Sequence, residues 1–466
     1  MKLSFHGATR MVTGSKHLLH INATKKILLD CGLFQGMGKD TGKLNEDWGF
    51  DPKEISHVII SHAHIDHSGL LPKLVKDGYK GKIYCTPATA TLAKILLVDS
   101  ARIQEADIRY ANKRRQRENR ELIEPLYTED DAEKVFPLFE TIPYNEPYTV
   151  DKGVELTFTD CGHILGSAAV NLQIREKGIT TRLTFSGDVG RYRDMILRSP
   201  QTFPQADYII LESTYGDKLH DLMSTANDKL LEHILETCVR NRGKLVIPAF
   251  SLGRTQEILY MLNRLELEKR LPDLTYYVDS PLSVNITEAV KRYPGCFNSS
   301  VQHYLKNDDD VFSFKGLQHI EDVQDSIKLN DSKEPCVIIS ASGMAEAGRV
   351  KHHIANNISD SRNKILLTGY CEPQSLGGRL KRKPMEVTIF GKPHLVKAEI
   401  AEITSLSAHG DYEDLSQWLA CQDPRQVKKV FLVHGEYEVQ QNFKERLIRK
   451  GFTDVEIPDQ HTAFGI

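Results

Sequence analysis

Four potential metal ligands crowd into six residues directly after an apolar strand. The run HVIIS is followed by HAHIDH, which contributes His62, His64, Asp66 and His67. On an extended chain, residues two apart project to the same side, so His62 and His64 can share one cation. The turn that follows can carry Asp66 and His67 toward a second one. Imidazole and carboxylate groups suit zinc, so the cluster predicts a two-metal site; the alternative is a polar loop in which histidines coincide.

Two more candidate ligands stand in matching places, each just after a predicted strand. They are His163 in CGHILGS and Asp188 in SGDVG. Taken singly, a histidine in such a place is usually a surface or capping residue, and an aspartate before glycine is usually a turn former. Their agreement in position with the dense cluster at residues 62–67 favours metal binding for both.

These motifs, together with the strand-terminal Asp30 in LLDCG, resemble the signature of the metallo-β-lactamase superfamily over residues 1–190. The resemblance implies an αββα sandwich with the metals at one edge. It also implies two Zn²⁺ per chain, the first held by His62, His64 and His163, the second by Asp66 and His67, with Asp188 bridging them. Asp30 would orient the ligands around it, which is the support that metal-bound side chains need. On this basis Asp30 and Asp66 count among the catalytic residues.

The pattern of predicted strands and helices changes after residue 207. From Tyr208 onward apolar strands alternate with helices, as in YIILES, DKLLEHILETCVR, KLVIPAF and RTQEILYMLNRLELE. This alternation predicts a second domain built on a parallel sheet. We therefore expect a discontinuous first domain of residues 1–207 and 385–466, with residues 208–384 inserted as the second domain.

Three motifs further along the chain carry additional candidate residues. They are Glu212 in ILESTYG, His409 in SLSAHGD and His434 in VFLVHGE. Together with PAFSLGRTQEILY and SASGM, and in this order, they resemble the β-CASP group. That group is the RNA- and DNA-processing branch of the superfamily, related to the cleavage-and-polyadenylation endonuclease. The resemblance covers essentially the whole chain and implies that the inserted domain is a β-CASP domain.

The same resemblance suggests roles for these three residues. His434 would complete the ligand set of the second zinc, and members with histidine there are typically RNases, whereas DNA-repair members carry a valine-like residue. A buried structural histidine is the alternative. Glu212 beside His409 would keep the imidazole protonated and oriented, so that it can donate a proton to the leaving oxygen. The implied products carry a 5′-phosphate and a 3′-hydroxyl.

Candidate phosphate contacts lie in the predicted second domain. SASGM follows the apolar strand CVIIS and is predicted to open the helix AEAGRVKHHI. Small residues let backbone N–H groups approach an anion, and a helix start adds favourable partial charge. Ser340 and Ser342 are therefore candidates to hold a phosphate, with a plain helix cap as the alternative. Arg379, in the basic run RLKRK, is a third candidate. A second basic run lies at residues 113–117; a solvated face is the alternative for both runs.

Composition limits the partners that the chain can have. The net charge of −3 gives no global attraction to nucleic acid, so local basic patches would have to gather a polyanion. No apolar run reaches the roughly eighteen residues of a membrane span, and no secretory h-region stands at the start. The eight cysteines form no C-x-x-C pair, which favours the cytoplasm. We expect single-stranded RNA as partner and no membrane, and a homodimer is left open.

The predicted function is a zinc-dependent ribonuclease acting by a two-metal mechanism, with endo- or 5′ exonucleolytic mode left open. Three alternatives remain. A small-molecule ester or thioester hydrolase explains the first 190 residues but gives no purpose to the inserted domain. A DNA nuclease is disfavoured by His434. An inactive scaffold within an RNA-processing assembly is disfavoured because every motif position is filled.

Overall fold

The computed structural model describes residues 1–221, 223–306, 308–369 and 371–466, which cluster into two compact units. The first unit comprises Met1–Tyr192, Ser199–Leu219 and His409–Ile466. The second comprises Arg193–Arg198 and His220–Ala408. Residues 385–408, expected in the first domain, cluster with the second unit, and the domain boundary stays a prediction.

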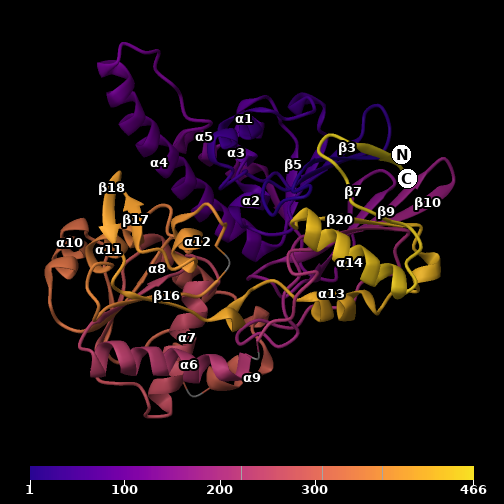
Figure 1. Ribbon diagram of the computed structural model, residues 1–466. Helices are drawn as coiled ribbons and strands as arrows, with labels where there is room; N and C mark the ends of the chain where they lie inside the picture. The colour runs from indigo at the N-terminus through magenta and orange to yellow at the C-terminus, as the bar shows by residue number, and fades with distance from the viewer. Residues whose placement is uncertain (222, 307, 370) are drawn as a thin grey trace. The chain divides into compact units, whose positions relative to one another are not determined.

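Two seven-stranded sheets form the framework of the first unit. In order across the first sheet, the strands are β22 (Ala463–Gly465), β1 (Lys2–Gly7), β2 (Lys16–His20), β3 (Lys26–Leu29), β4 (His57–Ile59), β5 (Lys82–Cys85) and β6 (Phe139–Thr141). Across the second sheet they are β21 (Val455–Glu456), β20 (Lys429–Val433), β11 (Tyr208–Glu212), β10 (Ile179–Phe185), β9 (Ala168–Glu176), β8 (Val154–Asp160) and β7 (Tyr148–Asp151). Because β1 pairs with β22, the two ends of the chain lie together (Figure 1).

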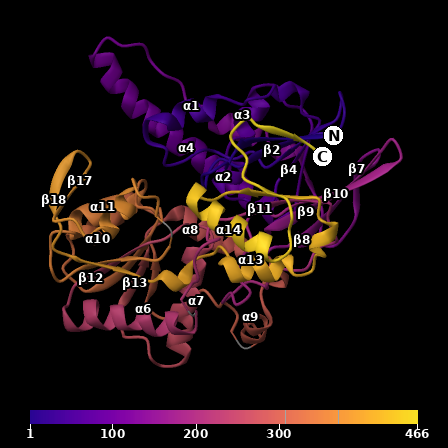
Figure 2. The ribbon, with the colours of Figure 1, turned by 45° about the vertical axis from the view of Figure 1, so that its right-hand side comes forward.

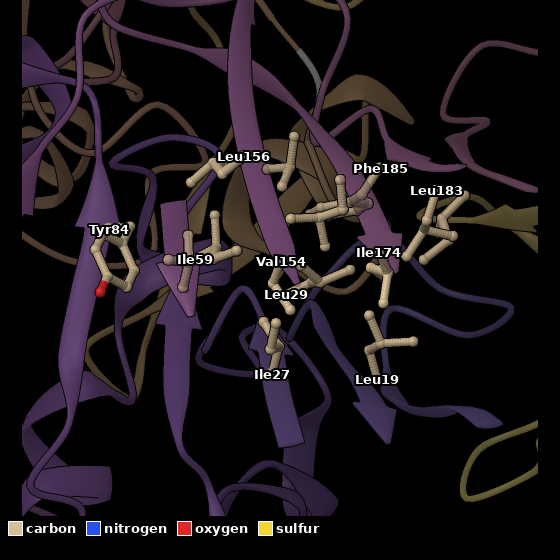
Figure 3. Close-up of a cluster of buried hydrophobic side chains, with 14 of the residues drawn as sticks. Leu19, Ile27, Leu29, Ile59, Tyr84, Val154, Leu156, Ile174, Leu183 and Phe185 are labelled. Carbon is tan, nitrogen blue, oxygen red and sulfur yellow. The ribbon is translucent and has the colours of Figure 1, made fainter. Parts of the chain in front are cut away.

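The apolar core of the first unit lies between these sheets. Successive side chains of a strand point to opposite faces, so an alternating strand such as β8 buries one face. Its Val154 and Leu156 share one buried cluster with Leu29 and Ile59 of the opposite sheet. Figure 3 shows these side chains meeting from the two layers. Each fully buried aliphatic side chain contributes about 1.5–3 kcal/mol, so this interface holds the two sheets together.

Helices cover the two outer faces of the sandwich. Buried residues of α3, α4 and α5 pack on the first sheet, and those of α13 and α14 on the second. Figure 2 shows α13 and α14 side by side over the strands of the second sheet. The helices of this unit are α1 (Thr41–Glu46), α2 (Ile65–Ser68), α3 (Leu71–Lys76), α4 (Pro87–Arg117), α5 (Glu129–Glu133), α13 (Tyr412–Leu419) and α14 (Tyr437–Arg449), with short 3-10 turns at Gly38–Asp40, Pro52–Glu54, Phe136–Leu138 and Pro424–Gln426. The predicted αββα sandwich is confirmed.

A parallel sheet forms the centre of the second unit. In order, its strands are β14 (Leu317–His319), β13 (Thr275–Val278), β15 (Cys336–Ser340), β12 (Lys244–Pro248), β16 (Lys364–Leu367) and β19 (Glu399–Glu402). All five described pairings in it are parallel, as the predicted β-α alternation requires. A separate hairpin pairs β17 (Glu386–Ile389) with β18 (Lys392–Leu395).

The helices of the second unit connect these strands. They are α6 (Ala226–Ile234), α7 (Arg254–Leu267), α8 (Pro281–Val290), α9 (Ser299–Tyr304), α10 (Val323–Asp331), α11 (Arg349–Asn357) and α12 (Leu376–Lys381), with 3-10 turns at Met223–Thr225, Pro294–Cys296 and Thr404–Leu406 and a π-helical segment at Leu235–Arg240. The predicted parallel α/β architecture is therefore confirmed. Within the described ranges, no helix of either unit combines the length and the apolar composition that a bilayer crossing needs.

Candidate metal centre

All the predicted metal ligands of the first unit emerge at or just beyond the carboxyl ends of strands. Asp30 follows β3, the loop of residues 62–67 follows β4, His163 follows β8, Asp188 follows β10, and His434 follows β20. The strands of each sheet that carry them run in the same direction, so these ends meet at one edge. Asp30 and His434 adopt φ of 59° and 51°, the left-handed region that Asp and His enter more readily than most other non-glycine residues.

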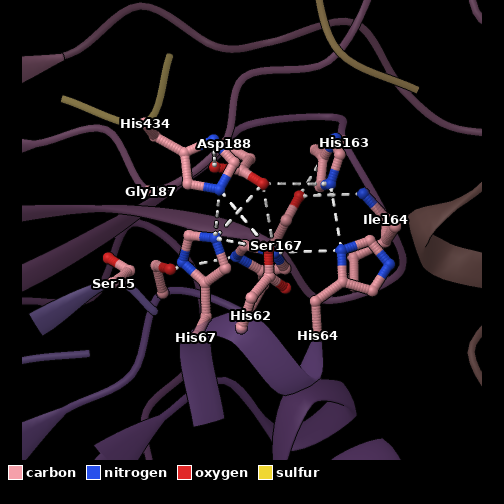
Figure 4. Close-up of polar contacts among 12 residues, drawn as sticks. Ser15, His62, His64, His67, His163, Ile164, Ser167, Gly187, Asp188 and His434 are labelled. Carbon is pink, nitrogen blue, oxygen red and sulfur yellow. Dashed lines mark hydrogen bonds and ion pairs between the residues drawn. The ribbon is translucent and has the colours of Figure 1, made fainter. Parts of the chain in front are cut away.

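Four side chains form a first cluster of ligand atoms. His64 Nδ1 lies 3.2 Å from His62 Nε2 and 3.3 Å from His163 Nε2. Asp188 Oδ2 lies 3.5 Å from the Nε2 atoms of both His62 and His163. All four ligand atoms lie within 4.8 Å of one another, and Figure 4 shows the side chains converging.

A second cluster adjoins the first and contacts the same aspartate. His67 Nε2 lies 3.2 Å from His434 Nε2 and 3.3 Å from Asp188 Oδ2. Asp66 Oδ2 lies 3.4 Å from His434 Nε2 and 4.0 Å from His67 Nε2. The three segments at residues 62–67, 163–188 and 434 are thus brought together, although His67 and His434 are separated by 367 positions along the chain.

The donor set fits zinc by spacing and by protonation. Atoms held by a tetrahedral zinc at about 2.0–2.1 Å stand roughly 3.3 Å apart, which matches the separations within the first cluster. Burial lowers the pKa of His62 well below its usual value and that of His64 to about 4, so both rings are neutral near pH 7 and offer lone pairs. Burial also disfavours a charged His67, but the carboxylates of Asp188, Asp30 and Asp66 outweigh it and raise the pKa of that ring. The centre therefore favours positive charge.

Buried hydrogen bonds to the second ring nitrogen orient the candidate ligands His67 and His434. His67 Nδ1 lies 2.6 Å from Asp30 Oδ2, which leaves Nε2 facing the cluster. Asp30 also accepts hydrogen bonds from the backbone N–H and the hydroxyl of Ser61. Thr214 Oγ1 lies 3.0 Å from Nδ1 of His434. Ser61 and Thr214 could not be predicted from the sequence, because single hydroxyl residues carry no spacing signal.

Glu212 and His409 lie together beside the ligand clusters. His409 Nδ1 is 3.1 Å from Oε1 of Glu212 and 3.9 Å from Oδ2 of Asp188. Glu212 is fully buried and accepts backbone hydrogen bonds from Val189 and Thr214, so it also holds the turn that carries Asp188. Burial by itself would lower the pKa of His409, but Glu212 and Asp188 outweigh it and raise the pKa to about 9. The pair can keep a proton close to the clusters.

Three family models match the chain. Residues 18–211 match a metallo-β-lactamase superfamily domain, residues 255–380 a Beta-Casp domain, and residues 394–458 a Zn-dependent metallo-hydrolase RNA specificity domain. Ribonuclease TTHA0252 of Thermus thermophilus is 34% identical and aligns over 94% of each chain. The chain belongs to the β-CASP family of metallo-β-lactamase-fold hydrolases.

Further relatives of this β-CASP chain are found in other organisms. An RNase J-like protein of Methanocaldococcus jannaschii is 31% identical over 93% of this chain and 92% of its own. Cleavage and polyadenylation specificity factor 73 of Drosophila melanogaster is 30% identical over 91% of this chain, which spans only 58% of that longer protein. A crystal structure of a protein of unknown function from Enterococcus faecalis matches the whole chain with a TM-score of 0.52 at 11% identity, a likeness of fold alone.

The predicted phosphate contacts lie in the β-CASP unit, and Ser340 and Ser342 stand before the start of α11 and not at it. Helix α11 begins at Arg349, so the prediction that SASGM opens this helix is wrong. Ser342 and its neighbours form a turn in which the Ser342 N–H donates to Ala347 O. The Ser340 hydroxyl is buried and donates to the Asp279 carbonyl at 2.7 Å. To donate to a phosphate, this hydroxyl would have to give up that hydrogen bond. Arg379, in α12, lies 3.8 Å from a Glu346 oxygen. The roles of Ser340, Ser342 and Arg379 stay predictions.

Proposed function

We propose that this chain is a zinc-dependent ribonuclease that hydrolyses phosphodiester bonds of single-stranded RNA with two zinc ions per chain. The observation that carries the proposal is the pair of adjacent ligand clusters that meet at Asp188. One ion would be held by His62, His64 and His163, and the other by Asp66, His67 and His434, with Asp188 between them. Asp30 would fix the His67 ring through its short contact to Nδ1.

The chain's own residues would then handle the substrate and the proton. Bound zinc supplies Lewis acidity, which makes water a stronger acid and offsets the charge that builds up on phosphate oxygens. His409, 18% exposed and held by Glu212, would donate a proton to the leaving oxygen. The buried Glu212 fixes the orientation of this ring and keeps it next to the clusters.

RNA as the substrate is supported by two independent points. Two curated relatives that align over more than nine tenths of both chains are named as a ribonuclease and an RNase J-like protein. His434, which the family resemblance associates with RNases, reaches the second cluster at 3.2 Å from His67. We further propose phosphate contacts by Ser340, Ser342 and Arg379 and a cytoplasmic setting. All eight cysteines are described and are free thiols, as expected in that setting.

The test is a metal-dependent digestion of end-labelled RNA by the purified protein. DNA of the same sequence and a chromogenic thioester run in parallel. We expect zinc-dependent cleavage of the RNA alone. His64→Ala should lose zinc and RNA cleavage together, whereas His303→Ala, which removes an exposed histidine of α9, should lose neither. Hydrolysis of the thioester with the RNA left intact would overturn the proposal.

A further inference from the structure

A projecting arm on the first unit has no role in the metal centre. Helix α4 runs for 31 residues, but its buried residues end at Ala101. Arg102 and Glu105 still bond to Glu129 of α5, and beyond them the helix leaves the body of the unit, a projection that both views show (Figures 1 and 2). We call residues 106–125, the projecting part of α4 with the segment that returns from it, the α4 arm.

Local contacts hold the α4 arm in shape without a hydrophobic core. The Asn112 side-chain amide donates to Ile123 O at 2.8 Å, and its carbonyl accepts from the Ile123 N–H at 3.0 Å. Arg115 Nε donates to Glu121 O at 2.5 Å. These bonds clamp the returning segment onto one side of the helix. The other side is left to the solvent.

That other side is strongly basic and carries an exposed aromatic ring. On a helix, residues three, four and seven apart share a face, which groups Arg109, Tyr110, Lys113, Arg114 and Arg117. All five are exposed, Tyr110 to 79%. The stretch from 109 to 117 contains five Lys and Arg and no Asp or Glu, in a chain whose net charge is −3. Among the described residues, Arg109, Lys113 and Arg117 make no ion pair, while Arg114 pairs with Glu118 at 2.8 Å.

We propose that this face of the α4 arm binds the phosphate backbone of RNA at a point remote from the metal centre. The inference rests on the proposed function, since it assigns a second contact to the same substrate. A row of cations beside an exposed ring fits a single strand, because the cations neutralise phosphates and the ring stacks on a base of any identity. A neutral protein surface would leave these charges without partners, so charge complementarity favours the polyanion.

The root of α4 connects the arm to the site. The hydroxyls of Thr86 and Thr89, at the start of the helix, both donate to the Gly166 carbonyl in the loop that carries His163. From Thr89 to Lys113 the helix rises about 36 Å at roughly 1.5 Å per residue. At about 3.4 Å per nucleotide of a stacked strand, this distance corresponds to roughly ten nucleotides. The arm should therefore matter for RNA longer than about ten nucleotides.

The test compares long and short RNA on the zinc-loaded protein. In the variant Arg109→Gln, Lys113→Gln, Arg117→Gln, we expect the Kd for an uncleavable RNA of about thirty nucleotides to rise about tenfold. The slope of log Kd against log salt should fall by about 2, as for three lost single-strand phosphate contacts. The advantage in kcat/KM of RNA of about thirty over about six nucleotides should fall by a similar factor.

A matched control removes the same charge from exposed positions outside the arm. Lys177→Gln, Arg449→Gln, Lys450→Gln should keep the wild-type salt slope and length preference. For the ring, Tyr110→Ala should weaken binding of the long RNA about tenfold and Tyr110→Phe should not, because stacking needs only the ring.

The outcomes separate the two proposals. In one outcome, the arm variant cleaves RNA with the length preference and the salt slope of the wild type. That result would overturn the role of the α4 arm and would leave the proposed ribonuclease activity unaffected. The arm variant can also change its mass in sedimentation while its RNA binding stays the same. That result would assign the arm to contacts between protein chains and would overturn the inference as well. Failure to cleave RNA with any metal overturns the ribonuclease itself.

Discussion

Each unit places a buried carboxylate beside a strand end and next to histidine, yet the two carboxylates have opposite surroundings. Asp279, after β13, is contacted by three donors: Ser326 Oγ at 2.5 Å, Arg349 Nη1 at 2.6 Å and His353 Nε2 at 2.6 Å. Asp188, after β10, has the Nε2 atoms of His62, His67 and His163 at 3.3–3.5 Å from Oδ2. Its Oδ1 has no hydrogen-bond partner among the described residues.

The difference separates a carboxylate whose partners all belong to the chain from one that we propose to bind metal. A buried carboxylate needs its lone pairs satisfied, and Asp279 is satisfied by the chain itself. Burial raises its pKa, but hydrogen bonds from His353, Ser326 and Arg349 outweigh burial and hold it below the usual value. Around Asp188, the pKa of His67 is raised, whereas burial lowers the pKa of His62 and His64, so these two neutral rings face each other with lone pairs at 3.2 Å. Only an added cation makes that arrangement favourable.

The largest expected effect comes from removing the aspartate that contacts both clusters. Asp188→Ala should reduce bound zinc to well below one ion per chain and lower turnover by about four decades or more, since metal catalysis supplies several kcal/mol of the barrier. Elemental analysis and single-turnover RNA cleavage measure the two effects. A variant that keeps two zinc ions would break the comparison, because Asp188 would then be no more a ligand than Asp279.

The next effect concerns a residue beside the clusters that is not proposed as a ligand. His409→Ala should keep its zinc and lower kcat by about two to four decades, as for a lost general acid. Loss of zinc in this variant would mean that His409 is a ligand and that the assigned role is wrong.

Glu212→Gln serves as the companion variant. By removing one of the carboxylates that raise the pKa of His409, it should move the alkaline limb of kcat to lower pH.

Much of the metal centre could be predicted because its ligands stand at strand ends in short, dense motifs. His62, His64 and the later His163 and Asp188 all carry that signal, and the structure brings them within 3.5 Å of a neighbouring ligand. Thr214 could not be predicted, because its contact with His434 joins positions 220 apart in the chain. Nothing local in the sequence distinguishes it from other threonines after a strand.

The start of α11 shows a different limit. The predicted helix AEAGRVKHHI starts with the good helix formers Ala345, Glu346 and Ala347. In the structure, backbone bonds such as Ala345 N–H to Ser342 O close a turn, and Gly348 adopts φ of 80° before the helix begins. These local hydrogen bonds pair the backbone groups of the turn without a helix, and helix propensity alone does not predict such a turn.

The Asp279 network provides the counterpart of the Asp188 experiment. Asp279→Ala should leave zinc content unchanged and lower the free energy of unfolding by about 3 kcal/mol, because Arg349 and His353 lose their buried partner. Denaturant unfolding followed with elemental analysis measures both. Since the folded pKa lies below the usual value of about 3.9, the wild-type advantage should be full at neutral pH and shrink as the pH falls below about 4. Zinc loss here would mean that the two carboxylates are not functionally distinct.

The smallest effect tests how the second cluster is kept ready for metal. The Thr214 hydroxyl can donate to His434 O at 3.1 Å, so its oxygen can accept a hydrogen bond from the Nδ1–H of His434 at 3.0 Å. This leaves Nε2 unprotonated and facing His67 and Asp66. Thr214→Ala should therefore weaken zinc binding by about tenfold, measured by competition with a chelator, while Thr214→Ser retains it. Equal zinc affinities in both variants would show that the Thr214 hydroxyl does not select the tautomer of His434. Its hydrogen bond to the His434 carbonyl would then be purely structural, like the bond from Ser340 to the Asp279 carbonyl.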